Sequence, residues 1–218
     1  MLQLSDYEVY IFDCDGVILD SNQLKIDAMK NAVASYTSDV YLVEQCIKYF
    51  KNNFGKSRFH HVDIFVSDIL KIDATLAEEA KVQLLALYSG QCKSLYMSAK
   101  ISDGFIEFIT ALKGKKYVAS GSEQSELREV FKERGLDQYF DEIYGSPEKK
   151  GNHIRAIIAD ADPSKAIMFG DAVSDLEAAK DNEVEFVFYS PLSNVKEKML
   201  SLCQLDSYKV INSFRGVS

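Results

Sequence analysis

A run of β-branched and aromatic residues, Val9 to Phe12, ends abruptly at two acids, Asp13 and Asp15, that flank a single residue. Such a run is typical of a fully buried strand. Ligands of an open α/β sheet bind beyond the carboxyl ends of its strands, so both acids are expected at the mouth of a crevice. Gly16 then lets the backbone turn away sharply. The pair predicts a cation site or an acid–base pair, with ordinary turn residues as the alternative.

The second half of the chain alternates between strand and helix patterns. Strands are predicted at 115–120, 143–144, 166–169, 184–188 and 208–211, the last of them at an edge, and helices at 103–111, 122–134, 150–159, 174–180 and 194–202. Together with the strand at 7–12, this alternation predicts a Rossmann-like α/β fold, in which helices flank a parallel sheet with right-handed crossovers.

The segment between these two regions carries only helical signals. Leu24, Ala28 and Val33 give one apolar face, and further helices are predicted at 40–50, 59–70 and 75–88, the last opening on a capping box at Thr75. We therefore expect a small α-helical cap domain at 17–97, inserted after the first strand. Residues 1–16 and 98–218 would form the α/β core domain.

Composition narrows the class of protein. The chain of 218 residues is 47% hydrophobic, which allows a sizeable core, and its net charge of -8 argues against nucleic acid or an anionic membrane as the main partner. No basic leader or bilayer-length apolar run is present, so we expect no membrane association and a cytoplasmic location, as a monomer or homodimer. The four cysteines show no metal-ligand spacing, which fits reduced thiols.

Polar residues also follow the later strands. Ser120 and Gly121 stand at the end of the strand at 115–120 and are predicted to open a helix, where a hydroxyl and free amides suit a phosphate oxygen. Asp171 and Asp175 follow the strand at 166–169, and Lys150 precedes another helix. Because the carboxyl ends of parallel strands lie side by side, these groups should converge. Helix capping and helix-dipole pairing are the simpler alternatives for Ser120 and the two acids.

In this order and spacing, the four groups resemble the motifs of the haloacid dehalogenase superfamily. The first motif reads Asp13-Cys-Asp15-Gly-Val-Ile-x-Asp-Ser, and it is followed by Ser120, Lys150 and Gly170-Asp171-x-x-x-Asp175. The resemblance runs along nearly the whole chain. The helical insert is similar to the small cap of the phosphoglycolate phosphatase and β-phosphoglucomutase branches.

This resemblance implies a role for each residue. Asp13 would be the nucleophile that forms an aspartyl-phosphate, and Asp15 the general acid and base. Ser120 would bind a phosphoryl oxygen and Lys150 would neutralise charge, although Lys149 is adjacent and no proline stands beside the lysine, as it does in other members. Asp13, the carbonyl of Asp15 and Asp171 would hold Mg²⁺. Asp175 would orient the metal shell or the lysine.

The expected function is a Mg²⁺-dependent phosphatase acting on a small phosphorylated metabolite, either a sugar phosphate or a phosphorylated acid. Gly121 and two basic residues of the cap, Lys56 and Arg58, are predicted to contact the substrate, with a solvated basic loop as the alternative for the last two. Two other functions stay open. One is a phosphosugar mutase, and the other is a non-catalytic binding or regulatory protein that keeps the fold.

Overall fold

The computed structural model describes residues 4–217, and its centre is a parallel sheet of six strands in the order β5-β4-β1-β6-β7-β8. The strands are β1 (Val9–Phe12), β4 (Lys115–Glu123), β5 (Glu142–Ser146), β6 (Ala166–Gly170), β7 (Glu185–Tyr189) and β8 (Lys209–Ile211). The predicted Rossmann-like α/β fold is confirmed, and β8 forms the expected edge strand.

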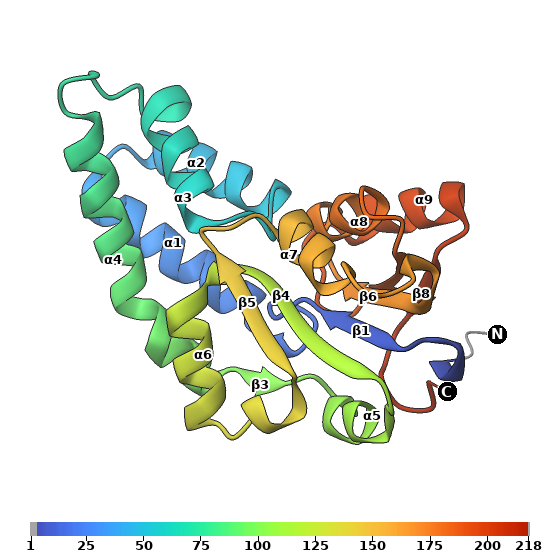
Figure 1. The fold of residues 1–218 in the computed structure, drawn as a ribbon. Helices are drawn as coiled ribbons and strands as arrows, with labels where there is room; N and C mark the ends of the chain where they lie inside the picture. The colour runs from blue at the N-terminus through green and yellow to red at the C-terminus, as the bar shows by residue number, and fades with distance from the viewer. Residues whose placement is uncertain (1–3, 218) are drawn as a thin grey trace.

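Helices cover both faces of this sheet (Figure 1). They are α5 (Phe105–Ala111), α6 (Gln124–Glu133), α7 (Lys150–Ile157), α8 (Val173–Lys180) and α9 (Lys196–Asp206). Side chains alternate along the central strand, so Tyr10 and Phe12 join the core under α5 and α6, whereas Val9 and Ile11 join the core under α7, α8 and α9. A strand buried on both faces explains the uninterrupted apolar run in the sequence.

The remaining helices lie together beyond the carboxyl ends of the strands, at the upper left of Figure 1. They are α1 (Asn22–Tyr36), α2 (Val40–Asn52), α3 (Arg58–Ile64), which continues into a π-helical turn η2 (Phe65–Ile69), and α4 (Ala77–Ser98). Two short strands, β2 (Leu19–Asp20) and β3 (Lys100–Ile101), pair antiparallel where the chain enters and leaves this helical segment. The division into a core and a cap domain stays a prediction.

Two local predictions in the helical segment were wrong. The Thr75 hydroxyl donates to Asp73 Oδ1 at 2.7 Å and caps no helix, since α4 begins at Ala77. On the predicted apolar face of α1, Ala28 and Val33 are buried, but Leu24 is 38% exposed, whereas Lys25 is only 8% exposed. The burial of Lys25 matters for the site described below.

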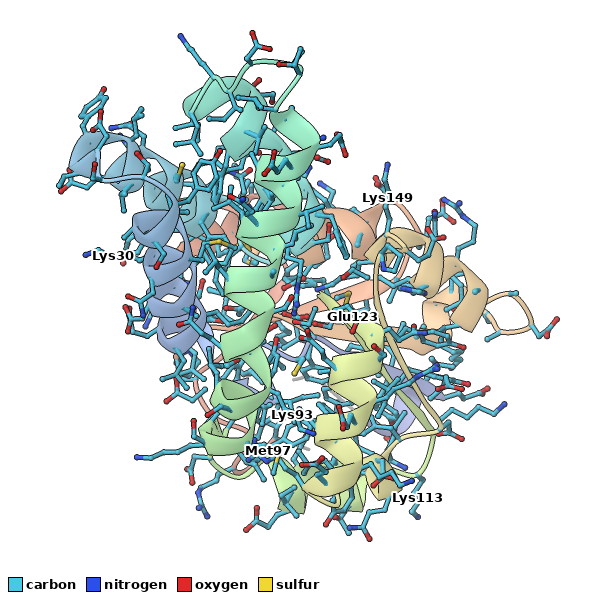
Figure 2. The ribbon with its side chains drawn as sticks, turned by 90° about the vertical axis from the view of Figure 1, so that its left-hand side faces the viewer. Lys30, Lys93, Met97, Lys113, Glu123 and Lys149 are labelled. Atoms are coloured by element: carbon cyan, nitrogen blue, oxygen red, sulfur yellow. The ribbon has the colours of Figure 1, made fainter. Side chains whose placement is uncertain are left out.

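The long helix α4 packs beside α6, and Figure 2 shows Lys93 between the two helices. Lys93 forms ion pairs with Glu129 at 2.7 Å and Glu133 at 2.8 Å. Exposed pairs of this kind contribute little to the free energy of unfolding. No helix within residues 4–217 is both long enough and apolar enough to cross a lipid bilayer.

Candidate active site

The register of the sheet brings residues from three distant parts of the sequence to one edge. Asp13 follows directly on β1, the central strand. Ser120 and Asp171 lie two residues beyond the partners of Phe12 in β4 and β6. All three therefore stand at the carboxyl ends of neighbouring parallel strands, where the helical segment covers the sheet.

Three buried acids form a cluster at this edge. Asp13, Asp171 and Asp175 can each offer a carboxylate oxygen such that the three atoms lie within 4.8 Å of one another. Among the residues that the structure describes, Asp13 Oδ2 and Asp171 Oδ1 have no hydrogen-bond partner. Buried, unpaired carboxylate oxygens are costly unless a cation joins them. Oxygen donors of this kind fit Mg²⁺.

Lys150 is the lysine that reaches the cluster. Its ammonium donates to Asp13 Oδ1 at 2.8 Å and also to Asp175 Oδ1, whereas Lys149 is exposed. The other carboxylate oxygen of Asp175 accepts the backbone N–H groups of Asp171 and Ala172, both at 3.0 Å. Both oxygens of Asp175 are thus in use, and this acid holds the lysine and the loop after β6 in place.

Burial changes the acidity of these groups. It raises the pKa of Asp13 to about 7, with Lys150 opposing the rise and the charges of Asp175 and Asp15 adding to it. Burial also raises the pKa of Asp171 well above its ordinary value, helped by the charges of Asp175 and Asp13. A bound cation favours the ionised form of a carboxyl group. The carboxyl groups of the cluster are therefore ionised more readily with a bound cation than without one.

Asp15 has a different environment. Its carboxylate accepts hydrogen bonds from Ser21 Oγ (2.6 Å), Lys25 Nζ (2.8 Å), Ser122 Oγ (2.7 Å) and Tyr96 Oη (3.2 Å). Burial alone would raise the pKa of Asp15, but the Lys25 ammonium and these donors lower it overall. Two neighbouring acids, Asp13 and Asp15, thus have pKa values shifted in opposite directions.

Asn22, the first residue of α1, supports the acid cluster. Its amide nitrogen donates to Asp171 Oδ2 at 2.7 Å and to the Leu192 carbonyl at 2.9 Å. Gly16 has a positive φ of 75°, and a Cβ there would lie 2.3 Å from Asp171 Oδ2 and 2.4 Å from Asn22 Nδ2. Glycine at position 16 is therefore required both by the turn and by this hydrogen bond.

The segment Ser120–Ser122 does not open a helix, which corrects the expectation from the sequence. It continues β4, and α6 begins only at Gln124. Ser120 is fully buried, and its hydroxyl oxygen accepts the backbone N–H of Ser122 at 3.1 Å. Gly121 touches the loop of the helical segment, because a Cβ there would lie 2.3 Å from the Gly55 carbonyl oxygen. The end of β4 therefore packs directly against that loop.

The two basic residues predicted to contact substrate lie in different places. Lys56 is exposed and lines a groove of about 600 Å³, together with Lys149 and Lys150. Arg58 is buried, and its guanidinium donates to both carboxylate oxygens of Glu126, at 2.8 and 2.6 Å, and to Ser89 Oγ. Lys56 is free to meet a ligand, whereas Arg58 is already paired.

Sequence reasoning missed five residues that contact the acids, namely Ser21, Asn22, Lys25, Tyr96 and Ser122. A signal existed for Lys25, because it lies three and four residues before Ala28 and Met29, which form the buried face of α1. A lysine on an apolar face needs an acid partner, and the first motif offers one.

Comparisons with known proteins agree with this geometry. A model of the haloacid dehalogenase-like hydrolase family matches residues 7–182. The chain is 24% identical over 207 residues to a phosphorylated carbohydrates phosphatase of Thermotoga maritima, covering 83% of this chain and 84% of that protein. It is 25% identical over 183 residues to the pyrophosphatase PpaX of Listeria innocua, covering 79% and 78%. The crystal structure of a β-phosphoglucomutase from Clostridium difficile has a similar fold, with a TM-score of 0.73, 20% identity and coverage of 97% and 93%.

Proposed function

The chain belongs to the haloacid dehalogenase-like hydrolase family, and from this premise we propose that it is a Mg²⁺-dependent phosphatase of small phosphorylated metabolites that works through an aspartyl-phosphate. One observation carries the proposal. Asp13 and Asp171 each direct an unpartnered, buried oxygen into one cluster, while Lys150 pairs with the other oxygen of Asp13, as judged over residues 4–217. Two relatives that are named as phosphatases also support the proposed phosphatase activity.

The proposed cation site uses the oxygens described above. Mg²⁺ would be held by Asp13, Asp171 and the main-chain carbonyl of Asp15, with Asp175 supporting the loop between them. When bound, the cation neutralises negative charge that would otherwise keep an anionic phosphate away from an anionic nucleophile.

The chain's own residues then have these roles. Asp13 attacks phosphorus through its carboxylate, and Lys150 opposes the rise in the pKa of Asp13 that burial causes. Ser120 and Gly121, at the end of β4, would donate to phosphoryl oxygens. Asp15 would protonate the leaving oxygen, for which it must first take up a proton against its lowered pKa, and would later activate the water that hydrolyses the acyl-phosphate. Its four donors hold its carboxylate in one orientation.

The groove lined by Lys56, Lys149 and Lys150 gives a substrate access to this edge of the sheet. We propose that Lys56 contacts the substrate there. Arg58 would instead hold the helical segment in place, because its ion pair with Glu126 joins α3 to α6. The proposed partner is a small phosphorylated molecule.

The test compares wild type with Asp13→Asn on p-nitrophenyl phosphate in the presence of Mg²⁺. Loss of a nucleophile lowers kcat on the order of 10³-fold or more. Asp20→Asn is a matched control, because this aspartate is exposed and belongs to the same segment. Equal phosphate release by wild type and Asp13→Asn would reject the proposed mechanism and favour a non-catalytic binding protein.

A further inference from the structure

A small enclosed pocket lies between the helical segment and the end of β4. Its lining includes Lys25, Arg58, His61, Tyr88 and Ser122, and we call it the inner pocket. Its volume is about 10 Å³, room for one water molecule or one hydroxyl group. Gly55, Lys56 and Gly121 line both this pocket and the 600 Å³ groove, so the inner pocket is an inward extension of that groove.

Two polar side chains of the inner pocket lack partners. His61 and Tyr88 are each 1% exposed. Neither ring nitrogen of His61 nor the hydroxyl of Tyr88 has a hydrogen-bond partner in the described part of the chain. Buried polar groups are nearly always paired, so three unpaired atoms beside one pocket indicate that something polar enters it.

The two buried cations of the inner pocket are both paired, and the third cation in its lining, Lys56, is exposed. Lys25 is paired with Asp15 at 2.8 Å, and Arg58 with Glu126 at 2.6 Å. Burial lowers the pKa of His61 to about 3, so its imidazole is neutral and offers one donor and one acceptor. A carboxylate beside His61 and Tyr88 would be buried where both buried cations are already paired, whereas a hydroxyl group can both donate and accept.

The inner pocket also lies on the side where a leaving group would be. Lys25 and Ser122, which line it, both donate to Asp15. Asp15 is the residue proposed to protonate the leaving oxygen. The part of the substrate that departs as an alcohol is therefore next to these residues.

We propose that the inner pocket receives a hydroxyl group of the leaving alcohol, hydrogen-bonded to His61 and Tyr88, and that the substrate is a phosphorylated sugar or polyol and not a phosphorylated acid. This inference rests on the proposed phosphatase function, since that function defines which side of Asp15 the leaving group occupies. His61 and Tyr88 become specificity-determining residues that touch the substrate away from the reacting phosphorus.

The experiment uses compounds matched in size as competitors of p-nitrophenyl phosphate hydrolysis by the full-length protein. One series has three carbons, with propyl phosphate, glycerol 3-phosphate and 3-phosphoglycerate. In a second pair, 6-phosphogluconate carries a carboxylate that glucose 6-phosphate lacks. We expect glycerol 3-phosphate and glucose 6-phosphate, which carry hydroxyl groups but no carboxylate, to compete at least about tenfold more strongly than the other members of their sets, because a buried hydrogen-bonding site rejects analogues that leave it unpaired.

Variants then assign the preference to the inner pocket. Tyr88→Phe removes only the hydroxyl group, and His61→Leu removes both ring nitrogens. Each should weaken competition by glycerol 3-phosphate about tenfold and leave propyl phosphate unchanged, since propyl phosphate has no hydroxyl to bind there. Tyr41→Phe, at an exposed tyrosine of α2, is the control.

Three results would overturn the inference. They are stronger competition by the two carboxylates, an equal effect of Tyr88→Phe on all compounds, and no effect of Tyr88→Phe on any, which would mean that the pocket holds a buried water only. Calorimetric titration of Asp13→Asn with the same compounds measures affinity without turnover. A protein that binds the hydroxylated compounds preferentially but hydrolyses none would refute the proposed function and not the inner pocket.

Discussion

Replacing Lys150 by methionine removes the only ammonium within residues 4–217 that bonds directly to the acid cluster. In the folded protein Lys150 donates to both Asp13 and Asp175, and its side chain is almost completely buried. Methionine keeps much of the apolar stem but leaves buried carboxylates without that counter-charge. The change therefore tests the electrostatics of the site more than its packing.

The size of the effect follows from the burial of these groups. Breaking a buried ion pair by removing one partner costs about 3–5 kcal/mol of unfolding free energy. The loss should be largest near pH 8. At lower pH Asp13, whose pKa is already raised to about 7, takes up a proton and relieves part of the repulsion. The kcat should fall about 10²–10³-fold, the usual cost of losing a donor that stabilises charge in the transition state.

Urea unfolding at pH 6 and pH 8, with and without Mg²⁺, measures the first effect, and p-nitrophenyl phosphate hydrolysis measures the second. Lys149→Met is the matched control, because this neighbour is exposed and makes no bond to Asp13 or Asp175 in the structure. We expect Lys149→Met to keep the stability and kcat of wild type. If both variants behaved alike at pH 8, the placement of Lys150 at the centre of the site would be wrong.

Two more predictions concern the proposed metal site. Asn22→Leu should weaken Mg²⁺ binding about 10–100-fold in calorimetric titration, because it removes the amide that orients Asp171, whereas Asn31→Leu on the exposed face of α1 should not. Metal-free protein should lose unfolding free energy as pH rises from about 4 to about 7, since the folded-state pKa values of Asp13 and Asp171 lie above their unfolded values and protons taken up on folding are then lost. Saturating Mg²⁺ should flatten that slope, and a metal-independent slope would contradict the site.

Most of the fold could be predicted because its strands carry a strong local signal. Strands such as Val9–Phe12 and Ala166–Gly170 are buried on both faces, so they appear as unbroken apolar runs bounded by charge and glycine. The positions of Asp13, Lys150 and Asp171 at one edge follow from the parallel topology. Their individual roles stay predictions.

The features that could not be predicted depend on tertiary contacts, which a local sequence pattern does not encode. Strands β2 and β3 have two residues each, too few to show a period. No role was predicted for Lys25, and the proximity of Asp15 makes its burial favourable. Arg58 appeared as a free cation in the sequence, but its partner, Glu126, is 68 residues away.

The contact between Gly55 and Gly121 has a consequence for the rate of turnover. A Cβ on Gly55 would lie 2.2 Å from Ser174 Oγ, and one on Gly121 would lie 2.3 Å from the Gly55 carbonyl, so this loop is held between β4 and α8. In the proposed mechanism, a bulky residue at position 121 would displace this loop, admit bulk water to the acyl-phosphate and so change the rate of its hydrolysis.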